Sequence, residues 1–82
     1  MSTRIFVNNM EVSSDWLKLT MRQQEILMKV AQGLSNREIA GNLHITEQTV
    51  KDHMYNIFRR LGVCNRTQLV SRIFGRESNP TS

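Results

Sequence analysis

The regular spacing of apolar residues is clearest between Ile45 and Gly62, in the stretch ITEQTVKDHMYNIFRRLG. At about 100° per residue, its apolar side chains fall within one narrow arc. The arc consists of Val50, Met54, Ile57 and Leu61, with His53 and Phe58 at its margins. Thr46 can accept a hydrogen bond from the first free N–H groups, and Gly62 can adopt the left-handed conformation that ends a helix. The pattern predicts one long helix with defined ends and a single buried face.

Two further helices are predicted at the edges of the apolar region. Thr20 and Gln23 have the spacing of a capping box and begin a helix over roughly residues 21–32. Asn65 repeats the capping pattern before a final helix over residues 66–74. The apolar side chains of this final helix are Leu69, Val70, Ile73 and Phe74. They form more apolar surface than one side of a short terminal helix normally buries, so part of it is expected to contact another copy of the chain.

A short helix is predicted between the 21–32 helix and the long helix at 45–62, and it begins with a second capping box at Ser35 and Glu38. Its apolar side consists of Ile39, Ala40 and Leu43. Glycine costs a helix interior about 1 kcal/mol relative to alanine, so Gly41 suggests close packing against another helix. Only His44 and Ile45 then precede the cap at Thr46. This is the spacing of a helix-turn-helix motif.

The two ends of the chain lack helical periodicity. Residues 1–18 are mostly polar with a weak alternation, and we interpret them as a flexible tether or linker. A short strand over residues 4–8 would have no evident partner. The residues expected to fold back over one edge of the core are Trp16, Leu17 and Leu19. The polar tail 76–82 is predicted to be disordered. The expected fold is all-α, a compact four-helix helix-turn-helix domain over residues 19–75.

Length and composition limit the function. Eighty-two residues with 39% hydrophobic content suffice for one small core and are too few for two domains, so a large substrate cleft is not expected. Cys64 is the only cysteine, which excludes an internal disulfide and a thiolate metal cluster. The apolar run at residues 5–7 is far too short for a signal peptide or a membrane span. We therefore expect a cytoplasmic protein with no membrane contact.

Positive charge is concentrated in the C-terminal half. Eleven Lys and Arg against seven Asp and Glu give a net charge of +4. Between Lys51 and Arg76, Asp52 is the only acid among the cations Lys51, Arg59, Arg60, Arg66, Arg72 and Arg76. This asymmetry favours a polyanionic partner, and the alternative is a solvated basic face without a partner.

Catalytic chemistry has little support in the sequence. His44 and His53 lie on different predicted elements, without an Asp or Glu at metal-ligand spacing and without an evident serine or cysteine partner. A hydrogen-bonded core histidine is the favoured interpretation of His53, ahead of a ligand, a general base or a phosphate contact. Cys64 is interpreted as a passive thiol. We therefore expect no catalytic residue, no metal site and no cofactor.

The polar face of the 45–62 helix is better suited to DNA, because it carries no large aliphatic residue and fits a major groove about 12 Å wide. Asp52, Tyr55 and Asn56 would point toward base edges, where a carboxylate can accept from cytosine and Asn can bond adenine. The residues expected near phosphates are Thr46, Gln48, Thr49, Lys51, Arg59 and Arg60. In the alternative reading, Asp52 pairs within the helix with Lys51 or Arg59, and the Tyr55 ring packs on Arg59.

From Leu19 to Phe74 the chain resembles the DNA-binding domain of the LuxR/FixJ/NarL class of bacterial transcription regulators. The resemblance rests on separated motifs in the right order: LTMRQQEIL, GLSNREIA, ITEQTVKDH and NIFRRLGVCNRTQLV. The stretch HMYNIFRRLGVCNRTQLV is also similar to the CsgD-like branch of biofilm-matrix regulators. Met21 replaces the proline that the family favours, and Gln23 replaces its usual glutamate.

The resemblance implies a four-helix domain whose third helix enters the major groove and whose fourth helix joins two copies on an inverted repeat. Carried onto this chain, the base-proximal positions are Lys51, Asp52 and Tyr55. The implied dimer surface consists of Gln68, Leu69, Arg72 and Ile73. Family members usually carry an N-terminal receiver or ligand-binding domain, and the sequence leaves open whether this chain is a C-terminal piece or a free-standing regulator.

Our leading hypothesis is sequence-specific binding of double-stranded DNA by a homodimeric bacterial transcription regulator, with RNA polymerase as a candidate further contact. The alternative is an interaction module that pairs with another regulator through the fourth helix and does not itself read DNA. Neither hypothesis involves an enzyme.

Overall fold

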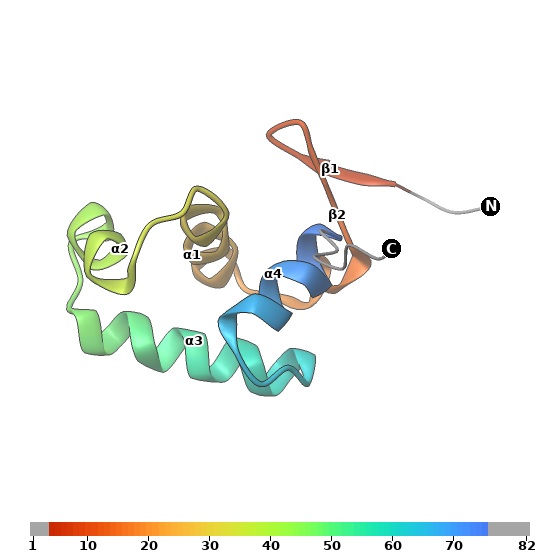
Figure 1. Ribbon diagram of the computed structural model, residues 1–82. Helices are drawn as coiled ribbons and strands as arrows, with labels where there is room; N and C mark the ends of the chain where they lie inside the picture. The colour runs from red at the N-terminus through yellow and green to blue at the C-terminus, as the bar shows by residue number, and fades with distance from the viewer. Residues whose placement is uncertain (1–3, 76–82) are drawn as a thin grey trace.

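The computed structural model describes residues 4–75 (Figure 1). Its elements, in order, are β1 (Ile5–Val7), β2 (Met10–Val12), a 3-10 helix (Ser14–Lys18), α1 (Met21–Ala31), α2 (Asn36–Leu43), α3 (Glu47–Leu61) and α4 (Arg66–Phe74). The predicted tail 76–82 lies outside the described residues, as do residues 1–3. Within residues 4–75, no helix combines the length and the apolar character needed to cross a membrane. The prediction of four helices is confirmed.

Each helix begins at its predicted cap because a side-chain oxygen replaces the missing backbone acceptor. The caps are Thr20, Ser35, Thr46 and Asn65, and each accepts a hydrogen bond from the backbone N–H three residues later. The first two are complete capping boxes. In the first, the buried Gln23 side chain accepts from Thr20 N at 3.0 Å, so glutamine fulfils the capping role.

The end of α2 differs from the ends of α3 and α4 because a residue other than glycine takes the left-handed conformation. Gly62 ends α3 with φ +70°, whereas α2 ends at His44 with φ +59°. The left-handed turn at His44 allows the chain to enter α3 after only Ile45 and the cap Thr46. The helix-turn-helix connection predicted from the spacing is therefore formed.

The core lies where α1, α2 and α4 pack against the long helix α3, which runs along the bottom of the view in Figure 1. The predicted apolar arc of α3 is buried, and its predicted margins, His53 and Phe58, are half-buried. The fully buried side chains that meet this arc come from the other three helices: Ile26, Leu27, Ile39, Leu69 and Ile73. One amphipathic helix thus organises the core.

The N-terminal segment differs from the predicted tether. Residues 5–12 form an antiparallel hairpin in which Ile5 pairs with Val12 and Val7 with Met10. The predicted strand therefore has a partner a few residues later in the chain. The turn is Asn8–Asn9, with φ of +50° and +66°. Asparagine tolerates these angles better than most residues, and two positive φ values match the twist of a tight hairpin.

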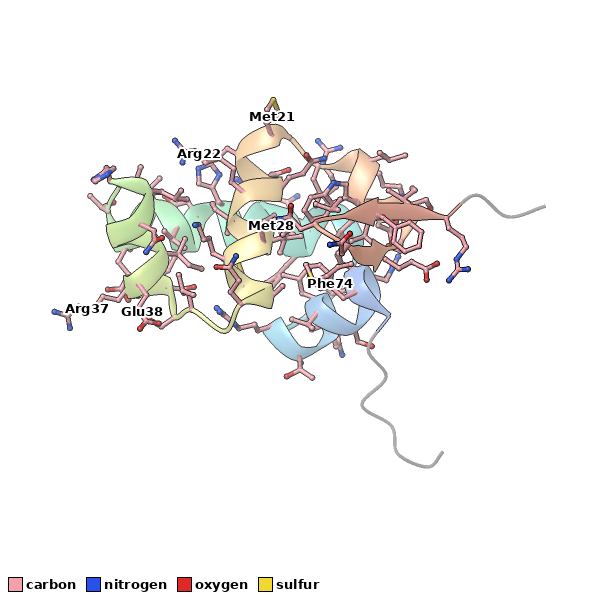
Figure 2. All side chains as sticks on the ribbon, turned by 90° about the horizontal axis from the view of Figure 1, so that it is seen from above. Met21, Arg22, Met28, Arg37, Glu38 and Phe74 are labelled. Atoms are coloured by element: carbon pink, nitrogen blue, oxygen red, sulfur yellow. The ribbon has the colours of Figure 1, made fainter. Side chains whose placement is uncertain are left out.

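The hairpin leads into the 3-10 helix, which packs against α4. Trp16 and Leu19 are buried, as predicted, whereas Leu17 is exposed. The Trp16 ring lies 6.4 Å from the ring of Phe74 at the end of α4, a residue labelled in Figure 2. The apolar surplus of α4 is therefore partly covered by the same chain. This reduces the area that a second copy would need to cover.

The expectation of close packing at Gly41 is wrong. Gly41 is exposed, and a Cβ atom built there would meet no atom within 4 Å. Its φ does not fall in the left-handed region either. Neither packing nor backbone conformation in residues 4–75 accounts for glycine at this position.

Candidate nucleic-acid interface

The polar face of α3 is exposed along its length. The exposed side chains on this face are Gln48, Lys51, Asp52, Tyr55, Asn56, Arg59 and Arg60. At its beginning, Thr46 Oγ1 accepts from Thr49 N at 3.0 Å and lies 2.9 Å from Thr49 Oγ1. These bonds fix the first turn, whose free N–H groups and dipole favour an anion. The predicted base-proximal and phosphate positions therefore lie on one continuous surface.

Asp52 has a partner that the sequence did not suggest. Gln48 Nε2 donates to Asp52 Oδ1 at 3.0 Å, one turn apart on the exposed face. The ion pairs found in residues 4–75 do not include Asp52. The alternative in which Asp52 pairs with Lys51 or Arg59 is therefore not observed there. The neutral Gln48 amide thus binds a carboxylate that lies among the cations of this face.

The Tyr55 ring packs on Arg59, which is the alternative that the sequence suggested. The residue is 60% exposed, and the Arg59 guanidinium carbon lies 5.7 Å from the centroid of the Tyr55 ring. Such a cation–π contact orients both side chains on the surface. Arg59 and Arg60 belong to the last turn of α3, where positive charge also suits the helix dipole.

Two of the cations in the C-terminal half have partners inside the chain. Arg66 donates to Asn36 Oδ1 at 3.1 Å and to the carbonyl oxygen of Leu34, which ties the start of α4 to the start of α2. Arg72 donates to Asp15 Oδ2 at 2.7 Å. The exposed positive charge of this half of the described chain is therefore concentrated on α3.

Two of the four residues predicted for the dimer surface lie on the buried side of α4. Leu69 and Ile73 are 0% exposed, because they fill the core against α3 and the N-terminal segment, so their side chains are not available to a second copy. Gln68 and Arg72 are exposed. They border a shallow hollow of about 390 Å³, which is lined by Gly62, Val63, Thr67, Gln68, Ser71 and Arg72.

A hollow beside α3 was not predicted from the sequence. This hollow of about 460 Å³ has Met54 and Phe58 at its apolar side. Its other lining residues are Asn36, Lys51, Tyr55, Cys64, Asn65 and Arg66. Cys64 is an exposed free thiol.

Figure 2 shows the exposed Arg37 pointing away from the start of α2. It lies in the first turn after the Ser35 cap, and arginine side chains and helix N-termini are both groups that contact phosphates in protein–DNA complexes.

The short α2, the tight turn at His44 and the exposed polar face of α3 define a helix-turn-helix domain. Residues 17–73 match the family model described as "Bacterial regulatory proteins, luxR family". The chain belongs to this family.

Similar proteins are transcriptional regulators. The CsgBAC operon transcriptional regulatory protein of Escherichia coli is 52% identical over 59 residues, covering 72% of this chain and 27% of that protein. The transcriptional regulatory protein LnrK of Bacillus subtilis is 47% identical over 62 residues, covering 76% of this chain and 28% of that protein. The chain therefore spans about a quarter of the length of these relatives.

A solved structure is also similar. The response regulator ChrA of a heme-sensing two-component system superposes with a TM-score of 0.64 and is 48% identical in sequence. The match covers 66% of this chain and 27% of ChrA. The family is thus supported by both sequence and fold, and the family model and the relatives named above are described as regulatory proteins.

Proposed function

We propose that the chain binds double-stranded DNA in a sequence-specific manner as part of a bacterial transcription regulator, with α3 in the major groove. The observation that carries this proposal is the α3 surface, where base-reading types of side chain lie between cations on a capped helix. Transcriptional regulators that are 52% and 47% identical over 59 and 62 residues support it. The domain that binds DNA would comprise residues 19–75 and act in the cytoplasm.

Some residues of α3 would contact the DNA backbone and others would contact base edges. Lys51, Arg59 and Arg60 would neutralise phosphates, and the first turn with Thr46, Gln48 and Thr49 would fix the register on the backbone. Lys51 would also reach base edges together with Asp52, Tyr55 and Asn56, because these side chains share the exposed face.

Two copies would bind an inverted repeat through the exposed side of α4. Gln68 and Arg72 keep their proposed place in this contact because they are exposed. Thr67 and Ser71 join them, since they line the same hollow. A two-fold contact of this kind matches the symmetry of a palindromic operator, with half-sites about one helical turn apart. RNA polymerase remains a proposed further contact.

Selection from a random-sequence DNA pool at two salt concentrations tests this function. Enrichment of an inverted repeat that persists at the higher salt supports sequence reading by a dimer. Binding that occurs only at low salt, without an enriched motif, contradicts the proposal because it is the behaviour of a basic surface alone. In that event the interaction module without DNA reading becomes the better hypothesis.

A further inference from the structure

Residues 13–16 are fixed to the last turns of α4 by three contacts of different kinds. Ser13 N donates to the carbonyl oxygen of Ile73 at 2.7 Å. Asp15 Oδ2 accepts from Arg72 Nε at 2.7 Å, and the Trp16 ring packs against Phe74. The 3-10 helix is therefore held in a fixed position on the helix that we propose as the dimer contact.

The ion pair places a carboxylate beside the proposed contact surface. The Asp15 side chain is only 14% exposed, whereas Arg72 is 45% exposed. Lys18 Nζ lies 3.1 Å from the other carboxylate oxygen of Asp15. The pKa of Asp15 is lowered, chiefly by its hydrogen bond with Arg72, so the carboxylate is charged at neutral pH. Arg72 also lines the hollow on the exposed side of α4.

A two-fold contact between α4 helices creates an electrostatic cost at this position. In such a contact each copy presents the same surface to the other, so the positive charge of Arg72 faces a surface that carries a second Arg72. Like charges that meet across an interface repel, and the repulsion grows as water is excluded. A carboxylate bound to each arginine reduces this repulsion and holds each guanidinium in one orientation.

We infer that Asp15 is a positioning and charge-compensating residue for self-association, which prepares the α4 surface for a second copy of this chain. The inference rests on the proposed function, because it takes the α4 contact from there. It adds a residue that precedes the part matched by the family model, which begins at residue 17. The N-terminal segment of this chain would thus contribute to dimer assembly without touching DNA.

The test compares wild type with Asp15→Asn on two DNA duplexes, one with a single half-site and one with the inverted repeat. We expect half-site affinity to change less than about twofold, while cooperative binding to the repeat weakens roughly threefold to tenfold. The loss should shrink at higher salt, because added ions screen the repulsion between the two arginines. In a Lys18→Gln background, which removes the cation 3.1 Å from the Asp15 carboxylate, the double substitution Asp15→Arg with Arg72→Asp restores the pair in reverse and should recover cooperativity.

Glu25→Gln is the matched control, because it removes one carboxylate from an exposed ion pair with Arg22 on α1. It gives the same gain in net charge without touching α4. Sedimentation equilibrium without DNA provides a second readout, in which Asp15→Asn should weaken self-association and Glu25→Gln should not. Thermal unfolding of each variant shows whether the domain remains folded.

The possible outcomes separate this inference from the proposed function. If the wild-type protein binds neither duplex, the proposed function is contradicted. Sedimentation equilibrium without DNA then tests the role of Asp15 independently. The inference is overturned if Asp15→Asn associates as wild type does. It is also overturned if the charge-reversed pair regains thermal stability without regaining self-association, because Asp15 would then stabilise only the fold.

Discussion

Gln48 and Asp52 form a hydrogen-bonded pair one turn apart on the exposed face of α3, with Nε2 and Oδ1 separated by 3.0 Å. This pair links a position proposed to lie near phosphate with one proposed to reach base edges. An i, i+4 bond of this kind contributes a few tenths of a kcal/mol to a helix, roughly 0.2–0.5. Its larger effect would be on orientation, because the amide limits the directions in which the carboxylate can accept.

We predict that Asp52→Asn changes base preference and raises general affinity. The carboxylate can accept from cytosine N4 but repels phosphates, whereas asparagine both donates and accepts. Discrimination at one base pair should change by about 1–3 kcal/mol. Selection and sequencing of bound duplexes measures this change. Gln48→Ala should alter preference at the same base pair as Asp52→Asn, and an effect confined to a different base pair would contradict the coupling.

Arg60→Ala should weaken binding to all sequences, because Arg60 is exposed on α3 and is proposed to contact phosphate alone. Removing one phosphate contact lowers the slope of log affinity against log salt by about 1, without a new base preference. Titrations at several salt concentrations, on specific and unrelated duplexes, measure this. Arg22→Ala, which removes an equal charge from α1, is the control. Equal effects of the two substitutions would show that only net charge matters and that α3 is not the contact surface.

The local features of the fold could be predicted from the sequence, because they depend on neighbours within one turn of helix. The caps at Thr20, Ser35, Thr46 and Asn65 and the buried arc of α3 are of this kind. The hairpin was missed although Asn8–Asn9 between two short apolar runs is a turn signal. Three-residue strands give too little alternation to be separated from a polar linker.

Long-range features could not be predicted in the same way. The burial of Leu69 within the chain was not predicted, because periodicity shows that a helix has an apolar side but not which segment covers it. Here the covering segments are α3 and residues 12–19, the latter far from α4 in sequence. The pair of Gln48 with Asp52 was also missed, because several partners lay at suitable spacing and only geometry distinguishes them.

Leu69→Ala should act on stability before it acts on any dimer contact. The side chain is fully buried, so its truncation leaves a cavity and should cost about 2–5 kcal/mol of unfolding free energy. Chemical denaturation measures this cost. Gln68→Ala is the comparison on the exposed side. Removal of the Gln68 amide deletes the hydrogen bond that it accepts from Cys64 N, which should cost about 0.5–1.5 kcal/mol of unfolding free energy. A Leu69→Ala protein of wild-type stability would contradict the burial of this residue.

Gly41→Ala should stabilise the domain by about 1 kcal/mol, because alanine has a better helix propensity and its Cβ would meet no atom within 4 Å. Gly62→Ala should do the opposite. Its φ of +70° lies in the left-handed region, which costs other residues about 1–2 kcal/mol. Denaturation of both variants measures the difference. Equal destabilisation by the two substitutions would show that Gly41 has a structural role that residues 4–75 do not reveal.

The acid sensitivity of the fold should depend on Asp15. Its pKa is lowered chiefly by the hydrogen bond with Arg72, with a smaller contribution from Lys18, while burial acts in the opposite direction. Because the pKa is lower in the folded state, the stabilisation is complete above the unfolded pKa of about 4 and is lost as pH falls through the folded value. Thermal unfolding between about pH 7 and pH 2.5 should therefore show a stability advantage of wild type over Asp15→Asn that disappears at the acid end. Glu11, whose pKa is lowered by Arg4, remains in both proteins and so cancels in the comparison. If the difference in stability between the two proteins stays constant across this range, the charge of the Asp15 carboxylate does not stabilise the folded state.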